Sequence, residues 1–176
     1  MTIKINELMT SSGVQFGTSG VRGLVKDMTD QVCFAYVTAF LQYLTEQELV
    51  PQGGKVGIAG DLRSSTPQIM NATAAACVNM DFEPINYGYI PSPAIALYGL
   101  KQHIPTIMVT GSHIPDDRNG IKFNTKIGEI LKHDEKGIRS QLVEVPVSLF
   151  SNENELINKH YLPVEINDAN ELYIQR

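Results

Sequence analysis

Short apolar runs alternate with amphipathic helical patterns through most of this chain, and this alternation limits the folds open to it. Strand-like runs occupy residues 55–59, 82–87 and 106–110. Helical spacing of apolar side chains is found at 31–47, from Thr66 to about 80, and at 92–102. Such alternation is typical of parallel βαβ units with right-handed crossovers. We therefore expect an α/β fold, a three-layer α/β/α domain with a mixed, mostly parallel sheet.

The segments around these units have their own signals. Residues 14–25 form a glycine-rich loop beside an early strand, and Asp30 is the expected N-cap of the first long helix. Asn119-Gly120 is a turn signal, and residues 120–131 are typical of a hairpin. Asp134 is expected to cap a further helix that ends near Val143.

A serine lies on a sharp loop at the end of the 106–110 strand. The run continues Gly111-Ser112-His113-Ile114-Pro115, in which Pro115 fixes its own φ and biases the residue before it away from helix. The hairpin returns Lys122 toward the same loop. A hydroxyl, an imidazole and an ammonium thus come from one segment, which suits nucleophilic chemistry on a charged substrate.

Charge and cysteine content exclude several classes of protein. The 176 residues include 14 Lys and Arg against 19 Asp and Glu, so the formal net charge is 14 − 19 = −5, which argues against nucleic acid as a partner. Cys33 and Cys77 are isolated, which fits reduced thiols in the cytoplasm. No signal peptide or membrane-spanning run is recognisable, so we expect no membrane partner.

Loops that follow parallel strands are expected to share one rim of the sheet, where ligands bind in open α/β folds. They are Gly60–Ser65, Gly88–Pro93 and the Ser112 loop, and Arg22 from the glycine-rich loop can join them. Arginines and glycine backbone N–H groups suit phosphate binding. The dinucleotide, P-loop and serine-hydrolase motifs are not matched in sequence.

Taken singly, these residues have simpler interpretations. Ser112 alone is more often a turn residue, and His113 alone a hydrogen-bonded loop histidine. Asp61 and Arg63 are as well explained by a local surface pair, and the glycines of 17–23 by ordinary turns.

Together the motifs are more specific, because four of them occur in one order. The chain resembles the α-D-phosphohexomutases, the family of phosphomannomutases and phosphoglucomutases, over about residues 14–145. The matching pieces are Phe16-Gly17-Thr18-Ser19-Gly20-Val21-Arg22-Gly23, the Gly60–Ser65 piece, the Ser92-Pro93 helix start, and Thr110–Pro115 followed by Asn119-Gly120-x-Lys122. Three positions depart from the commonest family pattern: Gly60, Gly111 and Ile114.

The resemblance implies a phosphoserine mechanism. Ser112 would be the phosphoserine, with Lys122, Arg22 and His113 as the basic residues around the transferring group. Thr18, Ser19, Asp61, Arg63 and Asn119 would support the phosphate and its loop. The reaction would move a phosphoryl group between O6 and O1 of a hexose phosphate, mannose phosphate being favoured, with hexose 1,6-bisphosphate as intermediate and activator.

The family also implies a magnesium ion, held between the phosphoserine and aspartates of a second domain. This chain would supply Ser112 alone as a ligand. We interpret residues 1–150 as the first domain and 151–176 as a linker and the start of a truncated second domain. The remaining domains of a longer protein would then be required, and the fragment alone is expected to be inactive.

Two alternatives stay open. Within the enzymes, the activity would be that of a phosphoglucomutase or a phosphoglucosamine mutase. In another class, the chain would be a non-catalytic module that binds sugar phosphates or a partner protein through the same loops.

Overall fold

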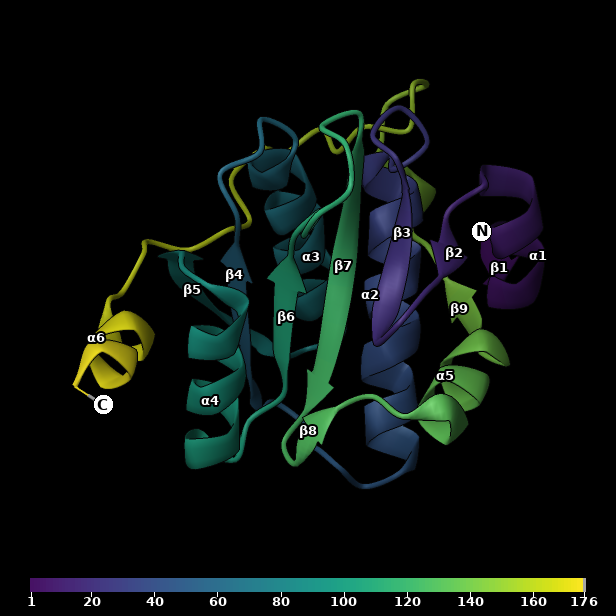
Figure 1. Ribbon diagram of the computed structural model, residues 1–176. Helices are drawn as coiled ribbons and strands as arrows, with labels where there is room; N and C mark the ends of the chain where they lie inside the picture. Colours follow the sequence, from purple (N-terminus) through teal and green to yellow (C-terminus); the bar gives the residue numbers. More distant parts are fainter. Residues whose placement is uncertain (176) are drawn as a thin grey trace.

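A seven-stranded sheet forms the middle layer of the molecule, with helices on both faces (Figure 1). The computed structural model describes residues 1–175. The strand order is β2-β3-β7-β6-β4-β5, and β8 pairs with β7. The strands are β2 (Gln15–Phe16), β3 (Gly20–Leu24), β4 (Lys55–Gly60), β5 (Glu83–Tyr89), β6 (Thr106–Val109), β7 (Arg118–Thr125) and β8 (Gly128–Glu129). The α/β class and the mixed sheet are confirmed.

The sheet is less parallel than predicted. Within residues 1–175, β4 pairs in parallel with β5 and β6, whereas the pairs β2–β3, β3–β7, β6–β7 and β7–β8 are antiparallel. The reason is the loop 110–117 between β6 and β7, which is too short for a parallel crossover of a dozen or more residues. The prediction of a mostly parallel sheet is therefore wrong outside the β5-β4-β6 half.

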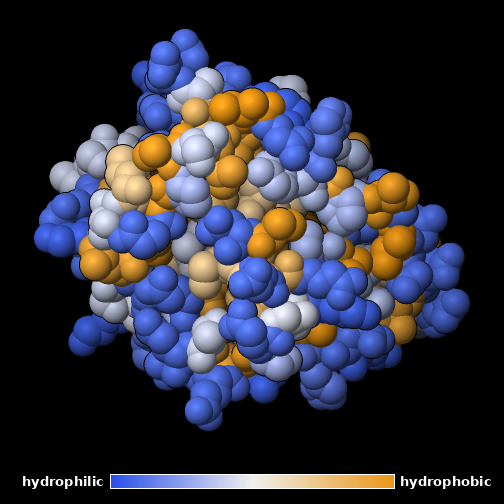
Figure 2. Space-filling model, turned by 180° about the vertical axis from the view of Figure 1, so that it is seen from behind, coloured by the Kyte–Doolittle hydropathy of each residue, from blue (hydrophilic) through white to orange (hydrophobic). Residues whose placement is uncertain are grey.

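The helices divide between the two faces. Figure 1 shows α2 and α3 behind the sheet and α4 in front of it. The helices are α1 (Ile5–Ser12), α2 (Asp30–Glu46), α3 (Thr66–Asn79), α4 (Ser92–Gln102), α5 (Lys132–Arg139) and α6 (Asp168–Ile174), with a 3₁₀ turn at Val147–Leu149. Figure 2, from the α2 and α3 side, shows a mixture of hydrophilic and hydrophobic side chains. No helix of the described chain is long and apolar enough to cross a membrane.

Three local predictions need correction. Thr29, not Asp30, caps α2, because its Oγ1 accepts the N–H of Val32 at 3.3 Å. The N-cap of α5 is Leu131 rather than Asp134, which lies at the third helical position and accepts the Leu131 N–H at 2.7 Å. Helix α5 ends at Arg139 rather than near Val143. The residues that follow form β9 (Leu142–Glu144), which pairs antiparallel with β1 (Thr2–Lys4) and competes with further helix.

Alternation along the central strands separates two cores and orients the site. Ile107 and Val109 join the large core under α2 and α3, whereas Met108 joins the smaller core under α4. Lys122 pairs with Met108 in the β6–β7 register and with Gly20 in the β3–β7 register. Because paired residues share a face of a sheet, Lys122 lies on the face that α4 covers.

Residues 151–175, here called the C-terminal strap, cross one edge of the domain and end in α6 beside α4 (Figure 1). Leu156 and Ala169 are buried in the two cores. Asp30 accepts the backbone N–H of Leu156 at 2.7 Å, and Asn71 accepts that of Tyr161 at 2.7 Å. The strap therefore packs on the first domain, and the domain boundary at residue 150 stays a prediction.

Candidate active site

Ser112 occupies a backbone conformation that non-glycine residues rarely adopt. Its φ is +54°, in the left-handed region, which costs about 1–3 kcal/mol when the surroundings impose it. Its N–H donates to Thr110 Oγ1 at 2.9 Å, and the N–H of Ile114 donates to Gly111 O at 3.1 Å. These bonds hold an exposed serine at the carboxyl end of β6, as the sequence predicted for the loop.

Arg63 holds the Ser112 loop by binding its backbone carbonyls. Its Nη2 donates to the carbonyls of Ser112 at 3.3 Å and Ile114 at 2.6 Å. Its Nη1 donates to the carbonyls of Pro115 at 2.9 Å and Arg118 at 3.3 Å. The guanidinium also contacts the exposed Asp116 carboxylate at 3.1 Å. Arg63 thus supports the loop through its backbone, and its donors are already engaged.

Asp61 ties Arg63 to the loop. Its carboxylate accepts N–H groups from Gly111 at 3.0 Å and Arg63 at 3.1 Å, and the Thr66 hydroxyl at 2.6 Å. The Arg63 Nε lies 3.3 Å away. Partial burial acts to raise the pKa of the Asp61 carboxyl, but these hydrogen bonds outweigh it, and the pKa lies below its ordinary value. The carboxylate therefore stays charged and keeps its three donors.

Two of the departures from the family pattern have packing reasons. A Cβ on Gly111 would overlap the Nε and Cζ of Arg63, so glycine lets the guanidinium reach the loop carbonyls. A Cβ on Gly60 would overlap Thr66 Cγ2 and Met70 Sδ. In this chain there is no room at Gly60 for a side chain, so it offers backbone only.

Asn119 joins the loop that follows β4 to the start of β7. It is fully buried, and its Nδ2 donates to Ser65 Oγ at 2.8 Å and Thr66 Oγ1 at 3.2 Å. Its Oδ1 accepts the N–H of Gly120 at 2.8 Å. The Asn119-Gly120 motif is thus a structural tie between two site loops.

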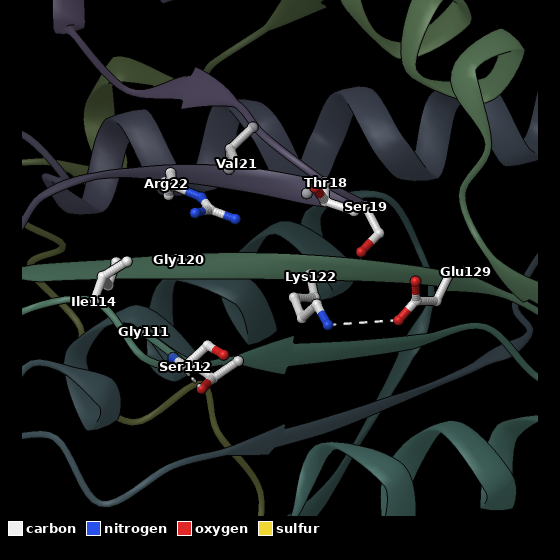
Figure 3. Close-up of a pocket in the computed structure, with 12 residues that line it drawn as sticks. Thr18, Ser19, Val21, Arg22, Gly111, Ser112, Ile114, Gly120, Lys122 and Glu129 are labelled. Atoms are coloured by element: carbon white, nitrogen blue, oxygen red, sulfur yellow. Dashed lines mark hydrogen bonds and ion pairs between the residues drawn. The ribbon is translucent and has the colours of Figure 1, made fainter.

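A cavity of about 240 Å³ brings several predicted residues together (Figure 3). Arg22 from β3 and Lys122 from β7 line it opposite the Ser112 loop. Its lining consists of Thr18, Ser19, Gly20, Val21, Arg22, Thr110, Gly111, Ser112, Ile114, Gly120, Lys122 and Glu129. A hydroxyl and two cations around one small polar cavity suit a phosphoryl group.

Arg22 is exposed on β3 and folds back over the glycine-rich loop. A Cβ on Gly17 would lie 2.8 Å from the Arg22 Nε. Glycine at this position therefore allows the guanidinium to lie against the loop backbone at the cavity.

Glu129 belongs to the cavity and was not predicted from sequence. Its Oε1 lies 3.4 Å from the Lys122 Nζ, the pair drawn as a dashed line in Figure 3. The hairpin register places Asn124 opposite Glu129. Lys122 is two residues before Asn124, so alternation alone puts Lys122 and Glu129 on one face. The hairpin predicted at residues 120–131 was therefore enough, with its register, to place Glu129 beside Lys122.

His113 is placed differently from the other predicted basic residues. It is exposed on the Ser112 loop and is not among the cavity residues. Asp116, on the same loop, contacts Arg63 rather than the cavity. Proximity along the sequence therefore does not by itself bring a side chain into the cavity.

The described residues fit a magnesium ion only in part. In residues 1–175 no group of three or more His, Cys, Asp or Glu side chains is arranged to hold a metal ion. The cavity supplies the Ser112 hydroxyl and the Glu129 carboxylate, and Glu129 is paired with Lys122. Magnesium prefers six oxygen ligands, so a complete site would need ligands from outside this segment.

Comparison with known proteins agrees with this fold. Residues 13–145 match the family model described as phosphoglucomutase/phosphomannomutase, alpha/beta/alpha domain I. A phosphomannomutase of Sinorhizobium fredii is 44% identical over 72% of this chain, and one of Salmonella muenchen is 42% identical over 75%. The chain belongs to the phosphoglucomutase/phosphomannomutase family, and it contains a phosphohexomutase domain.

The chain spans about a quarter of the length of those relatives, 27% in each case. A phosphoglucosamine mutase of Caldanaerobacter subterraneus is 37% identical over 66% of the chain. A solved structure of a candidate phosphomannomutase from Thermus thermophilus matches 92% of this chain and 35% of its own. Its TM-score is 0.70 at 22% identity, which supports the fold.

Proposed function

We propose that this chain is the phosphoserine domain of a phosphohexomutase, a sugar-phosphate isomerase, and that Ser112 carries the phosphoryl group. The observation behind the proposal is the strained, exposed Ser112 at a cavity that Lys122 and Arg22 also line. Mannose phosphates are the favoured substrates, because phosphomannomutases match at 42–44% identity and a phosphoglucosamine mutase at 37%.

The reaction would proceed in two phosphoryl transfers. The P–Oγ bond of phosphorylated Ser112 breaks, a P–O bond forms to the free O1 or O6 of a hexose monophosphate, and the sugar hydroxyl proton ends on Ser112. The resulting hexose 1,6-bisphosphate reorients. Its other phosphoryl group then returns to Ser112, and the serine proton passes to the departing sugar oxygen. No phosphoryl group is gained or lost over the cycle.

Charge stabilisation is the main task of the protein groups. A phosphoserine carries about −1.5 to −2 charges at neutral pH, and its transfer is promoted by fixed cations. Lys122 on β7 and Arg22 on β3 line the cavity and would supply these cations. Lys122 is also our preferred proton carrier, with the exposed His113 as the second candidate.

Magnesium and a bisphosphate activator complete the proposal. A phosphoryl group on Ser112 would supply one oxygen ligand to the metal, which would neutralise charge at the transfer centre. The other ligands and the grip on the distant sugar phosphate would come from further domains, so we expect residues 1–176 alone to be inactive. The buried free thiols Cys33 and Cys77 support a cytoplasmic location.

The alternative functions would use the same cavity. Phosphoglucosamine mutase is favoured by the relatives that bear that name, and phosphoglucomutase by the family description. Turnover assays with mannose 1-phosphate, glucose 1-phosphate and glucosamine 1-phosphate separate the three. A non-catalytic sugar-phosphate module would bind these compounds without turning any of them over.

The direct test is phosphate mapping. The full-length protein is incubated with hexose 1,6-bisphosphate and digested, and the modified peptide is identified by mass spectrometry. We expect label on Ser112, none in Ser112→Ala, and unchanged labelling in Ser64→Ala, which alters an exposed serine beside Arg63. Label on Ser19, Ser64 or Ser65 with Ser112 unmodified would refute the assignment.

A further inference from the structure

Glu129 is the only acidic residue that lines the Ser112 cavity in residues 1–175, where the cations are Arg22 and Lys122. Its carboxylate would repel the phosphoryl group that the two cations attract. The same carboxylate accepts a hydrogen bond from the Lys122 Nζ at 3.4 Å. The presence of an acid at this cavity is therefore best explained through its contact with Lys122.

Lys122 lies on β7 between the Ser112 loop and Glu129. On one side, the Gly120 carbonyl accepts an N–H from the start of the Ser112 loop at 3.0 Å, and on the other, Glu129 pairs with Asn124. Two residues of a strand span about 7 Å, a distance that a long side chain can cross. Figure 3 shows the same order, with the Lys122 ammonium directed toward Glu129. Lys122 can therefore reach either neighbour.

The contact between Lys122 and Glu129 is of a kind that exchanges easily. The two side chains are 34% and 54% exposed, and exposed ion pairs contribute little to stability. Both residues line the Ser112 cavity and also a second cavity of about 310 Å³ beside Ser92 and Pro93 of α4. Because the pair adjoins both cavities, Lys122 has space to turn away from Glu129.

We propose that Glu129 is a positioning residue for Lys122, which exchanges this carboxylate for the phosphoryl group when Ser112 is phosphorylated, an inference that rests on the proposed function. A phosphoserine carries about −1.5 to −2 charges, more than a carboxylate does, so it attracts the ammonium more strongly. While Ser112 is free, Glu129 holds Lys122 at the cavity. Once the phosphoryl group is in place, Lys122 moves to it and Glu129 is left to solvent. Glu129 thus acts through Lys122 and need not contact the sugar phosphate.

The exchange of partners is tested by NMR on this 176-residue chain, prepared with either serine or phosphoserine at position 112. Lysine side chains carry ¹⁵N, and the Lys122 Nζ resonance is assigned by its loss in Lys122→Arg. With serine at position 112, Glu129→Gln should shift this resonance, because the amide carries no charge. With phosphoserine, the resonance should already be displaced in the parent chain, and Glu129→Gln should have little further effect.

Lys4 and Glu7 provide a matched control, because they form an exposed pair at 3.0 Å outside the cavity lining. Glu7→Gln should shift the Lys4 resonance equally with serine and with phosphoserine at position 112. Equal shifts of the Lys122 resonance by Glu129→Gln in both states would show that Lys122 stays with Glu129. No shift in either state would show that the pair does not form. Either result overturns the proposal.

Labelling of the full-length protein gives a second test. Hexose 1,6-bisphosphate would bind while Ser112 is free, so Lys122 would have to leave Glu129. We expect Glu129→Gln to lower the bisphosphate concentration for half-maximal labelling of Ser112 by about two- to five-fold, and Glu7→Gln to leave it unchanged. A higher or equal concentration for Glu129→Gln would contradict the exchange. Absence of label in the parent protein would instead refute the proposed function, and the NMR comparison would still decide the exchange.

Discussion

Asp61 and Asp30 each fix an irregular segment of this chain by hydrogen bonds, but the two segments have different roles. Asp61 fixes the Ser112 loop, and Asp30 fixes the C-terminal strap. Asp61 binds the Gly111 N–H and Arg63, and so keeps Ser112 in a strained conformation at an exposed rim. Asp30 is 2% exposed and accepts Gln68 Nε2 at 2.8 Å and the Leu156 N–H. The same hydrogen-bond chemistry thus fixes site geometry in one place and closes the core in the other. Changes in the first region should affect activity, and changes in the second stability.

The largest effect is expected at Lys122. Lys122→Ala removes a fixed cation from the transfer cavity, and comparable losses cost about 2.7–4 kcal/mol of transition-state stabilisation. Turnover by the full-length protein should fall roughly 100- to 1,000-fold, with little change in thermal midpoint. Lys126→Ala, in the turn of the same hairpin and outside the cavity lining, is the control. Near-normal turnover in Lys122→Ala would remove this residue from the mechanism.

Arg63→Lys tests whether loop geometry matters separately from cavity charge. Lysine keeps the charge but lacks the planar fork that reaches several carbonyls. A small misplacement of a reacting group can cost about 100-fold, so we expect kcat to fall by about that factor. Arg139→Lys, on the half-exposed surface of α5, should leave kcat unchanged. Equal kcat values for the two variants would show that the loop holds Ser112 without Arg63.

Asp30→Asn tests whether the Asp30 region contributes to stability rather than to activity. The amide can still accept one hydrogen bond, but its NH₂ group then faces a donor, either the Leu156 N–H or Gln68. We expect the free energy of unfolding in urea to fall by about 1–3 kcal/mol, with kcat of the folded protein unchanged. Glu153→Gln, exposed on the strap, should stay within about 0.5 kcal/mol of the parent. A loss of kcat without a loss of stability would overturn the division of roles.

The smallest effect is the pH dependence that Asp61 contributes. Its pKa is lowered in the folded protein from an ordinary value of 3.8. A lowered pKa stabilises the fold above the unfolded value, and this stability is lost as pH falls through the folded pKa. Asp61→Asn should therefore lose less stability than the parent on acidification from about pH 5. Identical slopes in urea unfolding at several acidic pH values would contradict the hydrogen-bond assignment, and Asp117→Asn, an exposed change, is the comparison.

Predictions from local patterns succeeded where one element or one loop was enough. The helices at α3 and α4 and the strands β4 and β6 follow their apolar spacing closely, because each buries the face that the pattern marks. The sharp turn at Ser112 was expected from Pro115 and the glycine beside it. Helix α1 and the β1–β9 pair were not predicted, because short elements with few apolar residues depend on partners far away in the chain.

The sequence by itself determined the α/β class, the positions of the site loops and the family to which the chain belongs, since these depend on local periodicity and residue order. Only the tertiary structure decided that Arg63 serves the loop backbone, that Glu129 pairs with Lys122 and that Ser19 keeps an unsatisfied hydroxyl at the cavity. These facts depend on contacts between β3, β7, β8 and the loop after β4. A side chain's partner is set by where strands meet, and no local pattern contains that information.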